Sequence, residues 1–244
     1  VDLKDAYKSL DEALIHGSLS NDIELNAQWV DSTKINKNNV AKILKNYSAV
    51  LIPGGFGSRG TEGKIETITY ARKYKVPFFG ICFGMQMAVI ESARNLLGIK
   101  KATSSEFGNK GTHVIGLMDE WIKGKNIQKG SKNFLGGTMR LGSYKAKLKK
   151  NTLISKIYKS TLINERHRHR YEVNKNLKSK LEKKGLIFSG LSPDGSLPEA
   201  IELENHPWFI GVQFHPEFKS RPFSPHPLFS SFIKAAKNNS EKND

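Results

Sequence analysis

One cysteine, Cys82, stands in a context suited to nucleophilic chemistry. Gly80 and Gly84 flank it two residues away on each side, in the pattern Gly-x-nucleophile-x-Gly. Glycines at these positions permit a sharp strand-to-helix turn that exposes the central side chain at the helix N-terminus. The helix dipole there favours a thiolate. The pattern predicts a cysteine nucleophile, although a lone cysteine is more often a small buried apolar residue.

A cysteine nucleophile needs a base, and the base needs a partner that orients it. His215 has the best context of the seven histidines, because it follows a buried apolar run over residues 209–214 and precedes Pro216. Glu217 lies two residues further on, where its carboxylate can accept the distal N–H of the imidazole. We therefore predict a triad of Cys82, His215 and Glu217.

The segments around the cysteine alternate between predicted strands and helices. A buried strand over residues 76–79 leads into the cysteine turn, and a helix over residues 85–94 leaves it. Upstream, a strand over residues 48–52 ends in a second glycine-rich turn, and a helix over residues 64–73 follows. This order predicts an α/β fold with a parallel sheet and helices on both faces. Both turns lie at carboxyl ends of strands, so we expect them to be neighbours.

The remaining elements complete a single predicted domain over residues 1–237. We expect further helices over residues 5–16, 40–44, 151–158, 175–184 and 227–237, and further strands over residues 23–29, 112–117, 138–148, 167–173, 186–191, 198–204 and 208–214. The last two strands should form a hairpin, and Gly17 should end the first helix. Residues 123–133 are expected to be a polar loop, and residues 238–244 a polar, disordered tail.

The composition limits the function classes. The chain has 39 Lys+Arg against 23 Asp+Glu, a net charge of +16. Nucleic-acid binding is one reading of this excess, but the lysines are spread along the chain without a known motif, so we favour a solvated surface and no nucleic-acid partner. One cysteine excludes a disulfide framework and a four-cysteine zinc site. No apolar run approaches the ~20 residues of a membrane span, so we expect a cytoplasmic protein without a membrane partner.

Several motifs in order resemble one family. The cysteine turn, the upstream glycine turn and the histidine motif, at residues 80–86, 53–57 and 213–217, are similar to the class I (triad) glutamine amidotransferases. The resemblance narrows to the glutaminase domain of CTP synthase at residues 56–63, 135–142 and 165–174. It implies a flavodoxin-like three-layer sandwich, with a mostly parallel central sheet flanked by helices and a smaller antiparallel portion.

The resemblance also implies a reaction and its partners. L-glutamine would be hydrolysed through a γ-glutamyl thioester on Cys82, and the ammonia would pass to a synthetase domain that aminates UTP to CTP. ATP and Mg would serve that synthetase domain, which is absent from this chain, and the domain in hand would need no cofactor or metal. The full-length protein would be a homotetramer.

The resemblance further assigns residues to glutamine. Backbone N–H groups of Gly55 and Phe83 would hold the oxyanion, Glu106 the ammonium and Arg170 the carboxylate. Arg170 suits that role because a guanidinium reads a carboxylate with two hydrogen bonds, although a solvated surface charge is the alternative for both residues. The other expected contacts are Gly84, Met85, Gln86 and the main chain near Tyr171.

Activation by GTP is implied near Arg59, Gly60 and Glu62, together with a lid-like loop over residues 136–142. The glycines there could equally be plain turn residues. Metal binding by His167 and His169 is an alternative to hydrogen-bonded network roles, which we favour.

Two departures and several alternatives stay open. Phe83 stands where the family usually has leucine, and the strand expected before the first helix is absent or clipped at Val1.

An amidotransferase of GMP or carbamoyl phosphate synthesis is the main alternative function, and residues 165–174 argue against it. A cysteine hydrolase or redox-stress protein on a similar sheet would lack the distant His215 and Glu217 pair. A non-catalytic basic scaffold would leave Cys82 unreactive.

Overall fold

The computed structural model describes residues 7–117 and 139–242. Its strands are β1 (Val50–Ile52), β2 (Phe78–Ile81), β3 (Ala102–Ser104), β4 (Thr112–Leu117), β5 (Arg140–Leu148), β6 (Leu162–His169), β7 (Tyr171–Val173), β8 (Leu186–Leu191), β9 (Pro198–Leu203) and β10 (Phe209–Val212). The α-helices are α1 (Lys8–Leu19), α2 (Val40–Leu44), α3 (Thr61–Tyr74), α4 (Phe83–Asn95), α6 (Leu153–Tyr158), α7 (Lys178–Glu182) and α8 (Pro227–Ser240). The 3₁₀ turns are η2 (Ser32–Lys34), η3 (Ser105–Phe107), η5 (Lys175–Leu177) and η6 (Pro216–Lys219).

Seven strands form the central sheet, in the order β1-β2-β10-β9-β8-β5-β6, and a small second sheet has the order β3-β4-β7. β1, β2 and β10 are parallel to one another. From β10 onward the neighbouring strands pair antiparallel, including the predicted hairpin of β9 and β10. The parallel strands carry the cysteine and histidine motifs at their carboxyl ends, as the sequence predicts.

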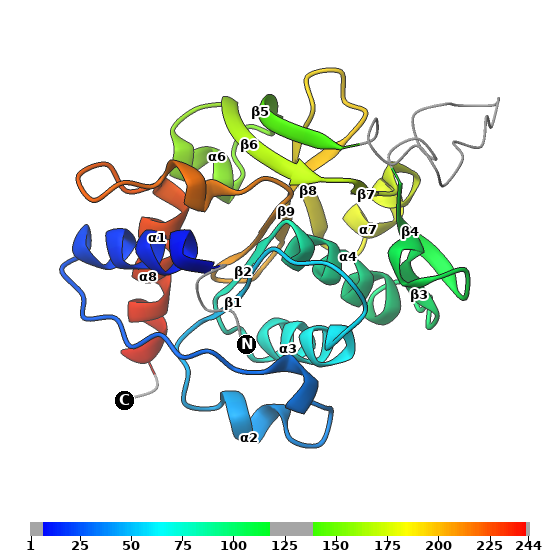
Figure 1. Ribbon diagram of the computed structural model, residues 1–244, viewed down its shortest axis with the longest axis horizontal. Helices are drawn as coiled ribbons and strands as arrows, with labels where there is room; N and C mark the ends of the chain where they lie inside the picture. Colours follow the sequence, from blue (N-terminus) through cyan, green and yellow to red (C-terminus); the bar gives the residue numbers. More distant parts are fainter. Residues whose placement is uncertain (1–6, 118–138, 243–244) are drawn as a thin grey trace.

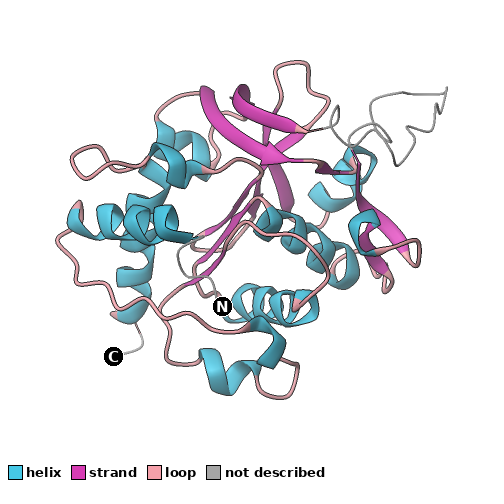
Figure 2. Ribbon diagram, viewed as in Figure 1, coloured by secondary structure: helices cyan, strands magenta, loops and turns pink. Residues whose placement is uncertain are grey.

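Helices cover both faces of the parallel strands (Figure 1). Figure 2 shows the resulting layers, with helices on either side of the central strands. β2 explains the arrangement, because Phe78 packs into the core with α3 and α4 while Phe79 packs on Trp208 and Phe229, on the side of α1 and α8. Both phenylalanines are fully buried. The α/β three-layer fold is therefore confirmed.

Gly17 does not end the first helix. α1 continues through it to Leu19. A Cβ on Gly17 would lie 2.9 Å from the backbone of Phe229 on α8. The glycine therefore allows two helices to pack closely and does not act as a cap.

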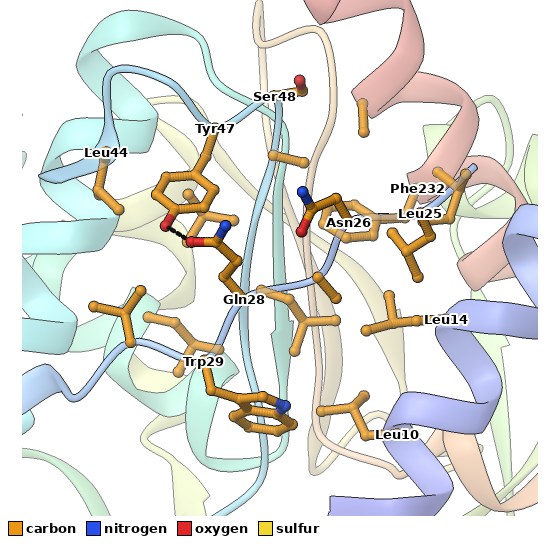
Figure 3. Close-up of a pocket in the computed structure, with 18 of the residues that line it drawn as sticks. Leu10, Leu14, Leu25, Asn26, Gln28, Trp29, Leu44, Tyr47, Ser48 and Phe232 are labelled. Atoms are coloured by element: carbon orange, nitrogen blue, oxygen red, sulfur yellow. Dashed lines mark hydrogen bonds between the residues drawn. The ribbon is translucent and has the colours of Figure 1, made fainter. Parts of the chain in front are cut away.

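The strand predicted over residues 23–29 is wrong. This segment is extended but has no strand partner among the described residues. Between it and β1 lies a groove of about 780 Å³, whose walls include Leu10, Leu14, Leu25 and Phe232 (Figure 3). An alternating pattern marks a half-buried face, but a strand also needs a neighbour for its backbone hydrogen bonds.

The strand predicted over residues 167–173 is two strands in different sheets. β6 pairs with β5 up to His169, whereas β7 pairs with β4 from Tyr171. Arg170 lies at the point where the chain changes partner. The chain therefore turns at the residue predicted to read the glutamine carboxylate.

The predicted disordered tail is partly wrong, because α8 continues to Ser240. β3 was not predicted from the sequence. The polar loop predicted over residues 123–133 and the glycines at 136 and 137 of the lid-like loop lie outside the described residues. Within the described ranges, no helix combines the length and the apolar character needed to cross a bilayer.

Candidate active site

Cys82 occupies a strained turn between β2 and α4. Its φ of 50° and ψ of −98° are unusual for a residue with a side chain. Its backbone N–H donates to the carbonyl of Val212 at 2.7 Å, which ties the turn to the end of β10. Cys82 as a whole is 5% exposed.

The flanking glycines are required by close backbone approach. A Cβ on Gly80 would lie 2.8 Å from the backbone of Gly84 across the turn. A Cβ on Gly84 would lie 2.1 Å from the carbonyl oxygen of Ile52 at the end of β1. Real Cβ atoms do not approach so closely, so the Gly-x-Cys-x-Gly pattern is a packing requirement of this turn.

His215 reaches the same edge of the sheet from β10. Because β2 and β10 are parallel and adjacent, the residues after them leave the sheet side by side. The His215 N–H donates to the carbonyl of Arg166 at 2.7 Å, and Pro216 begins η6 directly afterwards. The ring Nδ1 lies 2.7 Å from Oε1 of Glu217.

The electrostatics of His215 reflect both predicted partners. Burial lowers the pKa of the imidazole, but the sulfur of Cys82 and the carboxylate of Glu217 outweigh burial and raise it to about 10. Nδ1 is engaged by Glu217, so Nε2 is the nitrogen available to the sulfur. Nε2 is buried and makes no well-formed hydrogen bond within the described residues. The arrangement suits an imidazolium beside a thiolate.

Gly54, in the glycine-rich turn over residues 53–57, is a further residue of this site, although the sequence assigned it no role there. A Cβ at this position would lie 2.7 Å from Cε1 of His215. The loop after β1 therefore packs directly on the imidazole. By contrast, a Cβ on Gly55 would meet only the ring of Phe83, at 3.8 Å.

The other residues predicted to contact glutamine surround the turn. Phe83, Gly84, Met85 and Gln86 form the start of α4 and are buried. Gln86 Nε2 donates to the carbonyl of Tyr171 at 3.0 Å, so the predicted Tyr171 main chain lies beside α4.

Glu106 lies in η3, and Arg170 lies between β6 and β7. Glu106 in η3 accepts a 2.6 Å hydrogen bond from the N–H of Gly57, in the turn after β1. Burial raises the pKa of Glu106, and the Gly57 N–H partly offsets this. Arg170 has a buried Nη1 without a hydrogen-bond partner among the described residues. A buried guanidinium nitrogen of this kind has capacity for an anionic ligand.

The residues assigned to GTP have structural partners. Glu62 makes two hydrogen bonds to the guanidinium of Arg94, at 2.7 and 3.1 Å. Gly60 has a φ of 69° and precedes α3, and a Cβ there would run into Ser32. The backbone carbonyl of Arg59 accepts from Lys64 at 3.4 Å. These contacts show how the three residues are held, and the expected role in activation by GTP stays a prediction.

His167 and His169 belong to a buried network on β5, β6, β7 and β9. His169 Nδ1 faces the carbonyl of Tyr171 at 3.2 Å and must donate to it, so its Nε2 accepts from Nδ1 of His167 at 2.8 Å. Burial lowers the pKa of His167 to about 2 and that of His169 to about 3. Among the described residues, no group of three or more His, Cys, Asp or Glu side chains is placed so that it could hold a metal ion.

Arg140, Glu172 and Glu199 complete this network. Arg140 and Glu172 lie within the motifs at residues 135–142 and 165–174, but the sequence indicated no role for any of the three. The Arg140 guanidinium lies 2.8 Å from Glu199 and 3.3 Å from Glu172. Burial raises the pKa of Glu172 to about 8 and that of Glu199 to about 7. Oε2 of Glu199 lies 3.5 Å from the unprotonated Nε2 of His167. A proton on Glu199 would satisfy both atoms.

Comparison with known proteins supplies independent information. Residues 2–235 match the family described as glutamine amidotransferase class-I. The chain is 69% identical over 239 residues to a CTP synthase of Pelagibacter ubique, covering 98% of this chain and 44% of the relative. It is 60% identical over 235 residues to a CTP synthase of Rhizobium meliloti, covering 96% and 43%. A structure of the Trypanosoma brucei CTPS glutaminase domain with bound acivicin superposes with a TM-score of 0.88 at 37% identity, over 97% of this chain and 90% of that chain.

Proposed function

Because the chain belongs to the class I glutamine amidotransferases, in the branch of the CTP synthase glutaminase domains, we propose that it hydrolyses L-glutamine with Cys82 as the nucleophile. One observation carries the assignment of roles. The sulfur lies on a strained turn beside a buried imidazole whose opposite nitrogen is held by Glu217. This arrangement supports a thiolate–imidazolium pair ready to attack a carboxamide.

The proposed reaction has two stages. The Cys82 thiolate attacks the carboxamide carbon, and the His215 imidazolium gives its proton to the leaving nitrogen, so that ammonia departs and a γ-glutamyl thioester remains. His215 then takes a proton from water, the hydroxide attacks the thioester, and collapse releases glutamate and the thiolate. Glu217 keeps the ring oriented and stabilises its charged form. Backbone N–H groups of Gly55 and Phe83 would hold the oxyanion, where loss of one donor costs about 3 kcal/mol in other enzymes.

Recognition of the amino-acid end of glutamine rests on two charged side chains. Arg170 would bind the carboxylate through its buried Nη1, which has no hydrogen-bond partner within the described part of the chain. Glu106 would bind the ammonium, and its present bond to Gly57 N–H supports a position beside the glycine turn. The start of α4, with Gly84, Met85 and Gln86, would line the rest of the site.

The use of the ammonia involves protein outside this chain. The chain spans about 44% of the length of the Pelagibacter relative. We propose that ammonia passes to a synthetase domain of the longer protein, for amination of UTP with ATP and Mg, in a cytoplasmic homotetramer. GTP activation around Arg59, Gly60 and Glu62 belongs to the same proposal.

Covalent labelling tests the nucleophile. Acivicin, the ligand of the Trypanosoma structure, should modify this chain once, at Cys82, and excess glutamine should slow the modification. As a matched control, the Ser9→Cys exchange in a Cys82→Ala background keeps one thiol per chain but moves it to the exposed face of α1. That variant should incorporate no acivicin at a comparable rate. Equal labelling of both chains, or labelling insensitive to glutamine, would contradict the proposal.

A further inference from the structure

The side chain of Gln213 contacts the sulfur of Cys82. Gln213 follows β10 and is fully buried. Its Nε2 lies 3.5 Å from Sγ. Its backbone N–H donates to the carbonyl of Glu199 at 2.9 Å, which fixes the residue to β9. The sulfur therefore has a neutral amide beside it in addition to the imidazole.

The hydrogen-bond network determines which end of this amide faces the sulfur. Gln86 Nε2 lies 3.0 Å from the carbonyl of Tyr171, and a carbonyl can only accept, so the NH₂ group of Gln86 must point there. The same NH₂ group lies 3.3 Å from Oε1 of Gln213. The oxygen of Gln213 is thereby engaged by a donor, and its own NH₂ group points at Sγ.

Gln86 is itself held relative to the cysteine. It lies one helical turn after Cys82 on α4, and its backbone N–H donates to the carbonyl of Cys82 at 3.2 Å. Cys82, Gln86 and Gln213 therefore form a closed ring of contacts. Both amides are almost entirely inaccessible to water, so a bulk solvent molecule does not replace the donor at the sulfur.

We propose that Gln213 is a further catalytic residue, whose carboxamide N–H donates to the Cys82 sulfur and stabilises its thiolate, with Gln86 as the positioning residue that fixes the direction of that amide. This inference rests on the proposed function of Cys82 as nucleophile. Donors to a charged acceptor are about twice as strong as neutral ones. A buried donor that stays aimed at sulfur also favours the thiolate when the thioester collapses.

Charged groups other than Gln213 also lie near the sulfur and influence its reactivity. His215 faces it from the loop after β10, with Glu217 behind the ring. On the side of Gln86, the carbonyl of Tyr171 joins the amides to the buried network of Arg140, Glu172, Glu199, His167 and His169. Lys64 of α3 lies over the ring of Phe83, next to the cysteine. Substitutions of Gln213 leave all of these groups in place.

The test is the pH dependence of alkylation of the whole chain by iodoacetamide, measured without glutamine. Cys82 is the only cysteine, so the rate reports one sulfur. Gln213→Met keeps the length of the side chain and removes the donor. We expect the pH of half-maximal rate to rise by roughly one unit, the tenfold effect of one hydrogen bond to a charged group. Gln213→Glu keeps the shape and sets a carboxylate against sulfur, and should raise it further.

Matched variants separate the proposed role from a packing role. Gln28→Met makes the same exchange at an exposed position and should leave the profile unchanged. Gln86→Met should shift the profile in the same direction as Gln213→Met but less, because the Gln213 amide is then free to rotate. If Gln213→Met does not fold, as judged by its unfolding transition, the isosteric Gln213→Glu decides.

Failure of the role proposed for Gln213 and failure of the proposed glutaminase function give different results. An unchanged profile in folded Gln213→Met or Gln213→Glu would overturn the role of Gln213, even in a chain that hydrolyses glutamine. A shifted profile in a chain that hydrolyses no glutamine would support the contact and remove the glutaminase assignment.

Discussion

Gly54 controls where the imidazole of His215 can lie. Its missing Cβ leaves the space that Cε1 of the ring occupies, since a Cβ there would be only 2.7 Å away. The backbone around Gly54 is fixed by β1, so an added methyl group must displace the ring. A histidine moved in this way would lose its alignment with both Cys82 and Glu217.

We therefore predict that Gly54→Ala lowers the rate constant of glutamine hydrolysis by roughly 10²-fold, the effect of misplacing a reacting group by about 1 Å. Steady-state kinetics and thermal unfolding of the same sample provide the measurement. Gly98→Ala is the control, because Gly98 follows the far end of α4, about 20 Å of helix from Cys82. Its positive φ of 72° should cost stability but not turnover. Unimpaired turnover in Gly54→Ala would refute this role.

At the same scale, the sequence predicts some site residues and not others. Short motifs of a few residues identify some of them: two glycines flank Cys82, and Glu217 follows His215 closely. The residue types within each motif already indicate the chemistry. The contact between Gln213 and Cys82 joins residues 131 positions apart. Nothing local in the sequence indicates that an amide and a sulfur will meet. The motif at residues 53–57 includes Gly54, but its contact with His215 is not evident from the sequence either, because the glycine leaves space for a ring that follows a different strand.

Among the elements, four strands share a buried charge network around Arg140. Two carboxylates face one guanidinium, so the network carries an excess of acid. Burial raises the pKa of Glu199 from 4.5 to about 7. The folded chain therefore holds a proton that the unfolded chain releases, and the free energy of unfolding should fall as the pH rises from about 4.5 to about 7.

Glu199→Gln should reduce that fall. The glutamine oxygen can still accept from Arg140, and its NH₂ group can donate to the unprotonated Nε2 of His167. Urea unfolding between pH 5 and 8 should show a flatter dependence than in the parent chain. Glu204→Gln, the same exchange on the surface, should keep the parent slope. Equal slopes in all three chains would show that Glu199 is ionised in the folded state throughout this range.

Other buried groups set the limits of that experiment. The lowered pKa values of His167 and His169 reduce stability as the pH falls below about 6.5. The raised pKa of His215, about 10, contributes stability that is complete below about 6.5 and lost as the pH rises toward 10. Both contributions are present in the parent and in the variant, so they cancel in the difference between the two curves. The pKa of Glu172, about 8, is raised by burial and in part by Glu199, so that difference reports Glu199 together with its effect on Glu172.

Helices and strands have the predicted bounds where the pattern of buried residues alone determines the element. α2 spans Val40–Leu44 and β8 spans Leu186–Leu191, as predicted. The wrong predictions concern segments whose structure depends on which strand pairs with them. The segment over residues 23–29 alternates like a strand but has no partner among the described residues, and β6 and β7 separate at Arg170 because they join different sheets. Periodicity reveals which face is buried but not which strand lies beside it.

For the whole molecule, the arrangement of parallel strands is what brings the site together. β1, β2 and β10 deliver Gly54, Cys82 and His215 to one edge, although these residues come from separate parts of the chain. The groove of about 780 Å³ beside β1 is lined by neither Cys82 nor His215. The fold thus concentrates the chemistry at the carboxyl ends of adjacent strands, the usual location in open α/β sheets.

Ammonia release from glutamine by the parent chain and by Cys82→Ala tests this account most directly. With both chains folded, as judged by matching unfolding transitions, the parent should turn over glutamine and the variant should lose at least about 10³-fold in rate, as expected for removal of a covalent nucleophile. Turnover by Cys82→Ala within tenfold of the parent would contradict the central claim, because no other thiol exists in the chain to replace it.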